Sequence, residues 1–318
     1  MDSYTKIKQL KEIINQKLPS LIGSQCIILD APYYHNIGDV LIWKGESDFL
    51  EENGIKCLYT ASYETCTFPK IDKCVTILFS GGGNIGDLYH EHVDFLLKIV
   101  LNYPDNRIIV CPQTVYYENR SRLEKDFQVL SSHRDLYFCA RDSTTYTTLV
   151  EFFGQHTILL PDMAFCIRWT SLEKYILGET KNKLIIKRDD CENLDSVRNH
   201  ITDGDVSDWP TFEYSFHCST FINKILKRIS DAKLPFLSSF FNRFWDYYFQ
   251  RSFSKMMIKE GVVFISPYRK IETTRLHGCI LSILLGKDIV LLDNSYGKNR
   301  NFYNTWLYDL DSVILEGL

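Results

Sequence analysis

The stretch of sequence that decides the fold is residues 270–293, KIETTRLHGCILSILLGKDIVLLD. A short β-branched run over 271–274 passes through Arg275 and His277 into an apolar run that is typical of a buried helix. Gly286 ends this helix, and a second buried strand is predicted after it. In open α/β folds, ligands bind where strands end and helices begin, and a helix N-terminus there favours an anion. The stretch therefore predicts a cationic pocket for an anionic substrate.

The strand that leads to Arg275 depends on how the residues before it are assigned. Composition alone favours a strand over 262–266, but the same residues could continue a helix from Phe253. We prefer the helix, because 271–274 then forms the strand and Arg275 emerges from its end. A second unit of strands and helices is predicted to begin near Lys183, with a strand-like run at 184–187.

The first half of the chain alternates short apolar runs with helix-length segments. A helix is predicted first, because Ile7, Leu10 and Ile14 recur at helical spacing. Strands are then predicted at 26–29, 56–60, 75–79, 107–111, 136–140 and 157–160, and helices at 39–53, 92–101 and 121–131. This alternation predicts a parallel sheet that is covered on both faces.

The fold expected from these patterns is an α/β protein with two Rossmann-like domains that face each other across a cleft. Its length of 318 residues is comfortable for two domains. We expect an N-terminal domain over 1–175 and a C-terminal domain over 176–300. A final segment over 301–318 is expected to pack back on the N-terminal domain.

Composition excludes several classes of protein. A net charge of −4 argues against a general nucleic-acid binder. The ten cysteines form no C-x-x-C pair and lie mostly in apolar runs, so we expect buried, reduced thiols in a cytoplasmic protein. The charged N-terminal helix is no signal peptide, and no apolar run reaches the length of about 18 residues that a membrane span needs. Cysteine and histidine spacing predicts no metal site.

Two motifs in the first half carry candidate site residues. HNIGD, at 35–39, follows the first strand and contains Asn36 and Asp39; Asp39 is either a helix N-cap or a carboxylate base in the cleft. SGGGNIGD, at 80–87, follows a buried strand and is either a structural turn or a loop that lines the substrate site. It is neither a P-loop nor a dinucleotide fingerprint. Its substrate-lining candidates are Gly82, Gly83 and Asn84.

The cationic candidates follow strands in both halves. Arg141 comes directly after the strand at 136–140 and is expected to point into the cleft, or else to form a surface pair with an aspartate. Arg275 offers a planar set of donors for a carboxylate or phosphate, and His277 can act as an acid near neutral pH unless it is a buried structural histidine. Lys298 lies in a basic loop after the last strand and could also meet a phosphate.

The region between the two halves is harder to interpret. Residues 189–208 are polar and predict a loop, and 219–229 suits a helix. Residues 233–259 combine nine aromatic side chains with five basic ones. This combination fits a helix at an anionic membrane surface, but it also fits an ordinary core helix with basic flanks. The sequence leaves both interpretations open.

The motifs HNIGD, SGGGNIGD, CPQT, ARD, PD and TTRLHG, followed by DNSYGKNRNFYNTW, occur in this order along the chain. Together they resemble the polysaccharide pyruvyl transferase family of bacterial capsular and exopolysaccharide synthesis. The resemblance implies a metal-independent, GT-B-like fold without a cofactor. It also implies phosphoenolpyruvate as co-substrate and a sugar diol as acceptor, with a cyclic pyruvate ketal and phosphate as products. At the matching positions it implies functional roles for Asp39, Arg141, Arg275 and His277.

The chemistry of this reaction gives each candidate residue an expected role. We assign His277 as the acid that protonates C3 of the enol and Asp39 as the base that takes a proton from the sugar hydroxyl. The arginines and Lys298 are expected to hold the two anionic groups, with the donor on the C-terminal domain and the acceptor on the N-terminal one. The acceptor is expected to be lipid-linked, so that the enzyme works at the cytoplasmic face of the inner membrane. The alternatives are a GT-B glycosyltransferase that uses a sugar nucleotide and a non-catalytic glycan-binding subunit of a capsule assembly.

Overall fold

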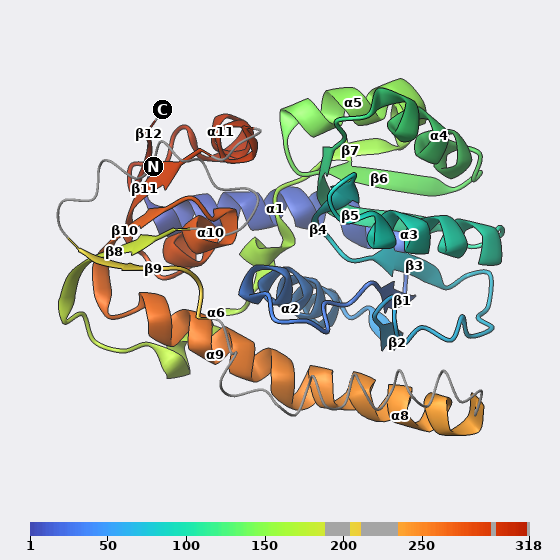
Figure 1. Ribbon diagram of the computed structural model, residues 1–318, viewed down its shortest axis with the longest axis horizontal. Helices are drawn as coiled ribbons and strands as arrows, with labels where there is room; N and C mark the ends of the chain where they lie inside the picture. The colour runs from blue at the N-terminus through green and yellow to red at the C-terminus, as the bar shows by residue number, and fades with distance from the viewer. Residues whose placement is uncertain (188–203, 211–234, 294–296, 317–318) are drawn as a thin grey trace.

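Two parallel β-sheets organise the part of the chain that the computed structural model describes, residues 1–187, 204–210, 235–293 and 297–316 (Figure 1). The first sheet has seven strands, in the order β2-β1-β3-β5-β6-β7 with β4 paired to β5. The second sheet has five strands, in the order β12-β11-β10-β8-β9. All of their pairings are parallel. The predicted α/β class with two sheets is therefore confirmed.

The first sheet and its helices come from the first half of the chain. The strands are β1 (Gln25–Leu29), β2 (Lys56–Ala61), β3 (Thr76–Phe79), β4 (Gly82–Gly86), β5 (Ile108–Tyr116), β6 (Leu136–Ala140) and β7 (Thr157–Leu159). The helices are α1 (Ser3–Ile22), α2 (Ile37–Glu52), α3 (His90–Asn102), α4 (Arg120–Ser131) and α5 (Ser143–Phe153), with short turns η1 (Gly154–His156) and η2 (Met163–Cys166). Strand β3 is buried along its whole length, as expected of a parallel strand covered on both faces.

The second sheet receives its helices from the C-terminal half. Short helices α6 (Trp169–Leu172) and η3 (Glu173–Tyr175) lead into β8 (Lys181–Ile186) and β9 (Asp205–Ser207). The rest follows as α8 (Pro235–Tyr248), η5 (Phe249–Phe253), α9 (Ser254–Ile265), β10 (Tyr268–Thr273), α10 (Leu276–Leu284), β11 (Asp288–Leu292), α11 (Lys298–Phe302), η6 (Tyr303–Leu307) and β12 (Val313–Glu316). The preferred assignment upstream of Arg275 is confirmed, because α9 continues to Ile265 and β10 ends just before Arg275.

Two sequence-based expectations are wrong in detail. The glycine-rich segment forms the short strand β4 rather than a loop, and a Cβ on Gly86 would lie 1.8 Å from the carbonyl oxygen of Tyr116. Residues 189–208 were expected to form one loop, but Asp205–Ser207 adds an edge strand to the second sheet. The remainder of that loop, and the helix expected at 219–229, lie outside the described residues.

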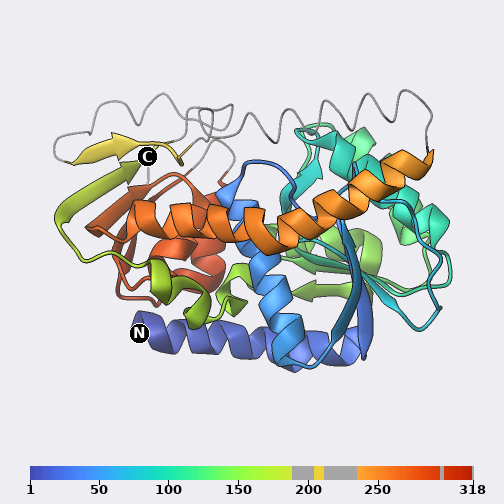
Figure 2. The same cartoon turned by 90° about the horizontal axis from the view of Figure 1, so that it is seen from below.

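Helix α1 connects the two sheets. It runs along both of them (Figures 1 and 2), with Lys6 paired to Asp309 at one end and Lys17 bonded to the carbonyl oxygen of Leu159 at the other. The C-terminal segment also reaches both sheets, because β12 pairs with β11 while Trp306 donates to the carbonyl oxygen of Arg141. Both ends of the chain therefore fix how the two sheets sit relative to each other.

The core at the junction of the two sheets is built from α2, α9 and α10. Ile37, Val262 and Leu281 belong to one buried cluster. A Cβ on Gly261 would lie only 2.9 Å from the Ile37 side chain, so α9 approaches α2 closely. This packing brings the first turn of α2 next to the start of α10, where a Cβ on Gly38 would lie 2.5 Å from Nδ1 of His277.

The aromatic segment forms α8, η5 and the start of α9, a long helical rod beside the first sheet (Figure 2). Trp245, Phe249 and Phe253 are buried, which agrees with a core helix. Phe244 and Tyr247 are exposed, so part of this rod presents aromatic rings to solvent. The membrane-surface interpretation therefore stays a prediction. No helix in the described part of the chain has both the length and the apolar character of a membrane span.

Five of the eight described cysteines follow the expectation of buried thiols, and Cys66 is partly buried. All of those described are free. Those at 26, 111, 139, 166 and 279 are buried, but Cys57 and Cys74 are exposed. Cys57 lies in the edge strand β2, where one side of the strand faces solvent.

Candidate active site

A cavity of about 370 Å³ is lined by both sheets' loops and helices. This volume lies in the range of small-molecule sites. Its wall in the N-terminal half consists of Tyr34, His35, Asn36, Asp39, Tyr63, Gly83, Asn84, Tyr89, Glu91 and His92. Its wall in the C-terminal half consists of Trp209, Arg275, Leu276, His277 and Lys298. The structure therefore brings Asn36, Asp39, Gly83, Asn84, Arg275, His277 and Lys298 together, as the sequence predicts.

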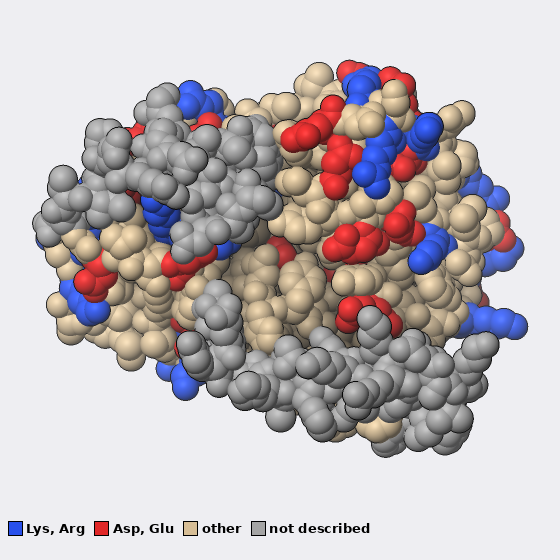
Figure 3. All heavy atoms as spheres, in the orientation of Figure 1, with Lys and Arg blue, Asp and Glu red and all other residues tan. Residues whose placement is uncertain are grey.

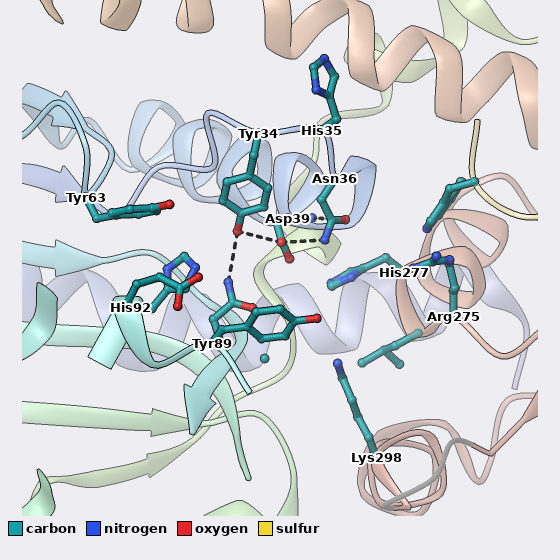
Figure 4. Close-up of a pocket in the computed structure, with 15 residues that line it drawn as sticks. Tyr34, His35, Asn36, Asp39, Tyr63, Tyr89, His92, Arg275, His277 and Lys298 are labelled. Atoms are coloured by element: carbon teal, nitrogen blue, oxygen red, sulfur yellow. Dashed lines mark hydrogen bonds between the residues drawn. The ribbon is translucent and has the colours of Figure 1, made fainter. Parts of the chain in front are cut away.

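Asp39 is held in place by two neighbouring side chains, one of which is supported by a third. Asn36 is the N-cap of α2, so Asp39 lies in the first turn and the N-cap interpretation of Asp39 is wrong. Oδ2 of Asp39 accepts hydrogen bonds from Tyr34 (2.9 Å) and Asn36 (2.8 Å). Asn84 in turn donates to the Tyr34 hydroxyl at 3.1 Å. This network fixes one oxygen of the carboxylate and aims the side chain into the cavity (Figure 4).

His277 lies opposite Asp39 in the first turn of α10 (Figure 4). The close approach of His277 to α2 depends on Gly38, because a Cβ there would lie 2.5 Å from Nδ1 of His277. Nε2 of His277 lies 3.2 Å from Oδ2 of Asp162, a buried residue between β7 and η2. Asp162 therefore orients the imidazole from behind, in the way that a carboxylate orients a catalytic histidine.

Asp162 remains an anion although it is fully buried. Burial disfavours its charged form, but the charge and hydrogen bond of His277 and the charge of Arg141 hold the pKa of Asp162 well below its usual range. Sequence reasoning gave Asp162 no role. Its one signal in the sequence was the PD motif, because the contacts to Arg141 and His277 come from distant parts of the chain.

Arg141 lies beneath the cavity rather than on its wall. Its guanidinium is completely buried, donating to Asp162 at 2.8 Å and to the Thr114 hydroxyl at 3.2 and 3.1 Å. Nη2 of Arg141 would lie 3.4 Å from a Cβ on Gly83. The expectation that Arg141 points into the cleft is therefore not met, because Asp162 and Thr114 take its donors. Direct contact between Arg141 and substrate stays a prediction.

Arg275 stands at the N-cap position of α10 and lines the cavity. Its Nε and Nη2 donate to the two carboxylate oxygens of Asp208, which follows the edge strand β9. Both side chains are 16% exposed. The bidentate geometry is the one that a carboxylate or phosphate ligand would adopt, so Asp208 occupies the position of an anion.

The glycine-rich strand β4 carries the floor of the cavity. Gly83 and Asn84 line it, whereas Gly82 is buried beside them. A Cβ on Gly83 would lie 2.8 Å from Nζ of Lys298, so the lysine reaches across from α11 to this strand (Figure 4). Arg300, the other basic residue there, instead pairs with Asp293 at 3.0 Å.

Glu46 on α2 supports the residues that precede β4. Its two carboxylate oxygens accept from the Gly81 backbone N–H at 2.8 Å and from the Ser80 hydroxyl at 2.9 Å. Complete burial raises the pKa of Glu46 to about 7. Glu46 is a positioning residue that no motif in the sequence indicated.

Acidic and basic side chains both appear on the face of the molecule drawn in Figure 3, so this face is not uniformly basic. Within the described ranges, no group of three or more His, Cys, Asp or Glu side chains is arranged to hold a metal ion. The cationic groups among the described residues that line the cavity are Arg275 and Lys298, together with its histidines when they are protonated.

The chain is similar to known proteins along most of its length. The model of the family "Polysaccharide pyruvyl transferase" matches residues 36–296. EpsO of Bacillus subtilis (strain 168), which bears the name of a pyruvyl transferase, is 33% identical over 330 residues, covering 99% of this chain and 96% of EpsO. Pyruvyl transferase 1 of Schizosaccharomyces pombe is 27% identical, covering 90% of this chain and 71% of its own. A crystal structure of a functionally uncharacterised protein from Klebsiella pneumoniae has the same fold, with a TM-score of 0.63 at 21% identity over 97% of this chain and 98% of that one.

Proposed function

Because the chain belongs to the polysaccharide pyruvyl transferase family, we propose that it transfers the pyruvyl group of phosphoenolpyruvate to a sugar diol. The products are a cyclic ketal and inorganic phosphate. The observation that carries the proposal is one cavity in which His277 faces Asp39 beside Arg275 and Lys298. This set combines a proton donor, a proton acceptor and two cations for a substrate with two anionic groups.

The donor binds at the wall formed by the C-terminal half. Phosphoenolpyruvate carries a carboxylate and a phosphate, and Arg275 offers a planar pair of donors that matches either group. Lys298 supplies a second positive charge beside Gly83. The N-terminus of α10 adds backbone N–H groups that favour an anion. The sugar then occupies the wall of the N-terminal half.

The reaction needs a proton at C3 of the enol and a base for the attacking hydroxyl. His277 gives its proton to C3, which leaves an electron-poor C2. A sugar hydroxyl forms a bond to C2 and loses its proton to Asp39. The C2–O bond to phosphate then breaks, and phosphate leaves with the bonding electron pair. Positioned proton transfer of this kind contributes a factor of about 10² to 10⁴ in rate.

The finer parts of the family resemblance extend this proposal. We infer a GT-B-like division into an acceptor domain over 1–175, a donor domain over 176–300 and a C-terminal segment over 301–318 that packs back on the acceptor domain. The acceptor is a hexose with free 4- and 6-hydroxyls in a capsular or exopolysaccharide repeat unit, carried on a lipid at the inner membrane. The location of the enzyme at the cytoplasmic face follows from that acceptor.

Phosphate release separates this function from its rivals. We expect phosphoenolpyruvate to raise the melting temperature of the protein, and hexosides of galactose, glucose or N-acetylglucosamine to trigger release of inorganic phosphate from it. Stabilisation by UDP-sugars without any effect of phosphoenolpyruvate would instead favour a glycosyltransferase. Binding of the hexosides with neither donor active would favour a glycan-binding subunit.

Replacing Asp208 by asparagine should tighten the binding of phosphoenolpyruvate. Asp208 occupies the donors of Arg275, so an anion must displace it before it can bind. The asparagine side chain would keep the size of the aspartate without its charge, and the dissociation constant measured by calorimetry should fall roughly 3- to 10-fold. The matched control is Asp205→Asn, because Asp205 pairs instead with Lys181 on the neighbouring strand. A weaker complex in Asp208→Asn would mean that Asp208 orients Arg275 for binding.

Replacing Gly38 by alanine should lower turnover through His277. The added Cβ would lie 2.5 Å from Nδ1 and 3.0 Å from Cβ of His277, so the imidazole must move. A displacement of this size at a reacting group costs roughly 10²-fold in rate. Gly178→Ala is the control, because a Cβ at Gly178 meets no atom of the described residues within 4 Å. Equal kcat values for Gly38→Ala and the wild type would contradict the placement of His277.

A further inference from the structure

The end of the cavity away from His277 contains a second histidine that is paired with a carboxylate. Nδ1 of His92, in the first turn of α3, lies 2.7 Å from Oδ2 of Asp30. Asp30 directly follows β1, and both residues are buried. His92 also lines the cavity. Figure 4 shows Asp39 between His277 on one side and His92 with Tyr63 on the other.

Asp30 is held in an unfavourable state, as residues with a functional role often are. Its backbone has φ 67°, the left-handed conformation that non-glycine residues rarely adopt. Its Oδ1 atom is buried and accepts no hydrogen bond from the described residues. A buried, half-satisfied carboxylate destabilises a fold. A role in positioning His92 accounts for its presence.

The pairing gives His92 the properties of a base. A carboxylate that accepts a hydrogen bond from Nδ1–H fixes the tautomer and leaves Nε2 to accept a proton. Burial alone would lower the pKa of His92, but the hydrogen bond and charge of Asp30 outweigh it and raise that pKa. Burial raises the pKa of Asp30 as well.

The surroundings of His92 suit a sugar better than an anion. The rings of Tyr63 and Tyr34 pack edge-on against the imidazole, at centroid distances of 5.3 and 6.2 Å. Glu91 adds a carboxylate that would repel phosphoenolpyruvate and accept hydrogen bonds from hydroxyl groups. The Tyr34 hydroxyl donates to Asp39, so this end of the cavity connects directly to the attacking base.

Closure of the ketal ring removes a second proton from the sugar. After phosphate leaves, the other sugar hydroxyl forms its own bond to C2 and loses a proton. Overall, the diol loses two protons, of which one appears on C3 and one on the phosphate, so the reaction releases no net proton. Asp39 holds the proton of the first hydroxyl and passes it to the phosphate. The proton of the second hydroxyl is taken by a base at the sugar end of the cavity and returns through solvent to His277, which gave its own proton to C3.

Resting on the proposed function, we propose that His92 is a further catalytic residue, which takes the proton of the second sugar hydroxyl, and that Asp30 is its positioning residue. The acceptor sugar then lies between Asp39 and His92, with its ring against Tyr63. Asp39 takes the proton of the hydroxyl that attacks first, before phosphate leaves. His92 takes the proton of the hydroxyl that closes the ring.

The test measures ring closure separately from donor binding. His92→Gln, Asp30→Asn and the double variant are incubated with phosphoenolpyruvate and the galactoside, glucoside and N-acetylglucosaminide, and the products are identified by proton NMR. A closed ketal gives a methyl singlet, whereas an open adduct that loses a C3 proton instead gives vinyl signals. His90→Gln is the matched control, because His90 lies on the same helix but outside the cavity, beside Asp94 and Asp126.

We expect His92→Gln to bind phosphoenolpyruvate within about twofold of the wild type and to form ketal roughly 10² to 10⁴ times more slowly. The product that remains should be enriched in the open, vinyl-bearing adduct. Asp30→Asn should reduce ketal formation less, and the double variant should fall no further than His92→Gln, since the two residues act as one unit. His90→Gln should match the wild type.

Stability distinguishes a catalytic pair from a structural one. Asparagine tolerates the left-handed conformation well and carries no charge to bury, so Asp30→Asn should melt at or above the wild-type temperature. A lower melting temperature together with unchanged turnover would overturn the inference, as would ketal formation by His92→Gln at more than half the wild-type rate. A wild-type enzyme that releases no phosphate would instead refute the proposed function, and this inference with it.

Discussion

The His277→Ala variant is expected to release phosphate about 10² to 10⁴ times more slowly than the wild type, while it still binds phosphoenolpyruvate. His277 faces the cavity from the first turn of α10 and is oriented by Asp162, which stays charged although it is buried. Removal of the imidazole takes away the group that we propose as the proton donor to C3. Arg275 remains in place, so the anion site is kept.

Two measurements on this variant separate catalysis from binding. The rate of phosphate release gives kcat, and calorimetry gives the dissociation constant of phosphoenolpyruvate. His156→Ala is the matched control, because His156 stacks on Tyr137 outside the cavity. Turnover near the wild-type rate in His277→Ala would show that another group protonates C3.

The Arg275→Ala variant is expected to lose binding of phosphoenolpyruvate. Loss of a bidentate, partly buried partner costs about 2–5 kcal/mol, which corresponds to a dissociation constant roughly 30 to 4,000 times larger. The effect is increased by Asp208, whose carboxylate pairs with Arg275 and would repel the anion once that arginine is removed. Arg275→Lys should recover little, because lysine cannot reproduce the planar pair of donors.

Arg300→Ala provides the comparison for Arg275. Arg300 is also basic and close in sequence to the cavity, but it is 45% exposed and pairs with Asp293. Calorimetry should therefore give the wild-type affinity for this variant. Equal losses in the two arginine variants would mean that general positive charge, rather than the geometry of Arg275, attracts the substrate.

The sequence predicts most of the elements because their signals are local. Apolar runs indicated most strands of the first sheet, and the β-branched run before Arg275 correctly placed β10 and the continuation of α9, but β9 and β12 were not predicted. The strand β4 was missed because glycines carry no strand signal. Its conformation depends on the close approach of Gly86 to Tyr116 on β5.

Sequence motifs at strand ends identify several residues of the candidate site. They do not identify the partners of these residues, which lie far away in the sequence. The motifs identify Asp39, Arg275 and His277, which line one cavity. The burial of Arg141 depends on Asp162, 21 residues later, and the pairing of Arg275 depends on Asp208, 67 residues earlier. No local pattern records which carboxylate satisfies which arginine, so only the folded chain reveals these partners.

The same limit applies to the second end of the cavity. In the sequence alone, the segment that contains His92 has the pattern of an ordinary amphipathic helix, and Asp30 is simply the residue after a strand. Their hydrogen bond joins residues 62 positions apart. Its position beside Tyr63 and Asp39 suggests a role only once both walls of the cavity are assembled.

The central claim is that phosphoenolpyruvate is the donor and a sugar diol is the acceptor. Its most direct test is proton and phosphorus NMR of the wild-type protein with phosphoenolpyruvate and hexosides that carry free 4- and 6-hydroxyls. The account predicts a new methyl singlet from a pyruvate ketal and one equivalent of inorganic phosphate for each ketal formed. Unchanged phosphoenolpyruvate with every hexoside, together with sugar transfer from a UDP-sugar to the same hexosides, would contradict it.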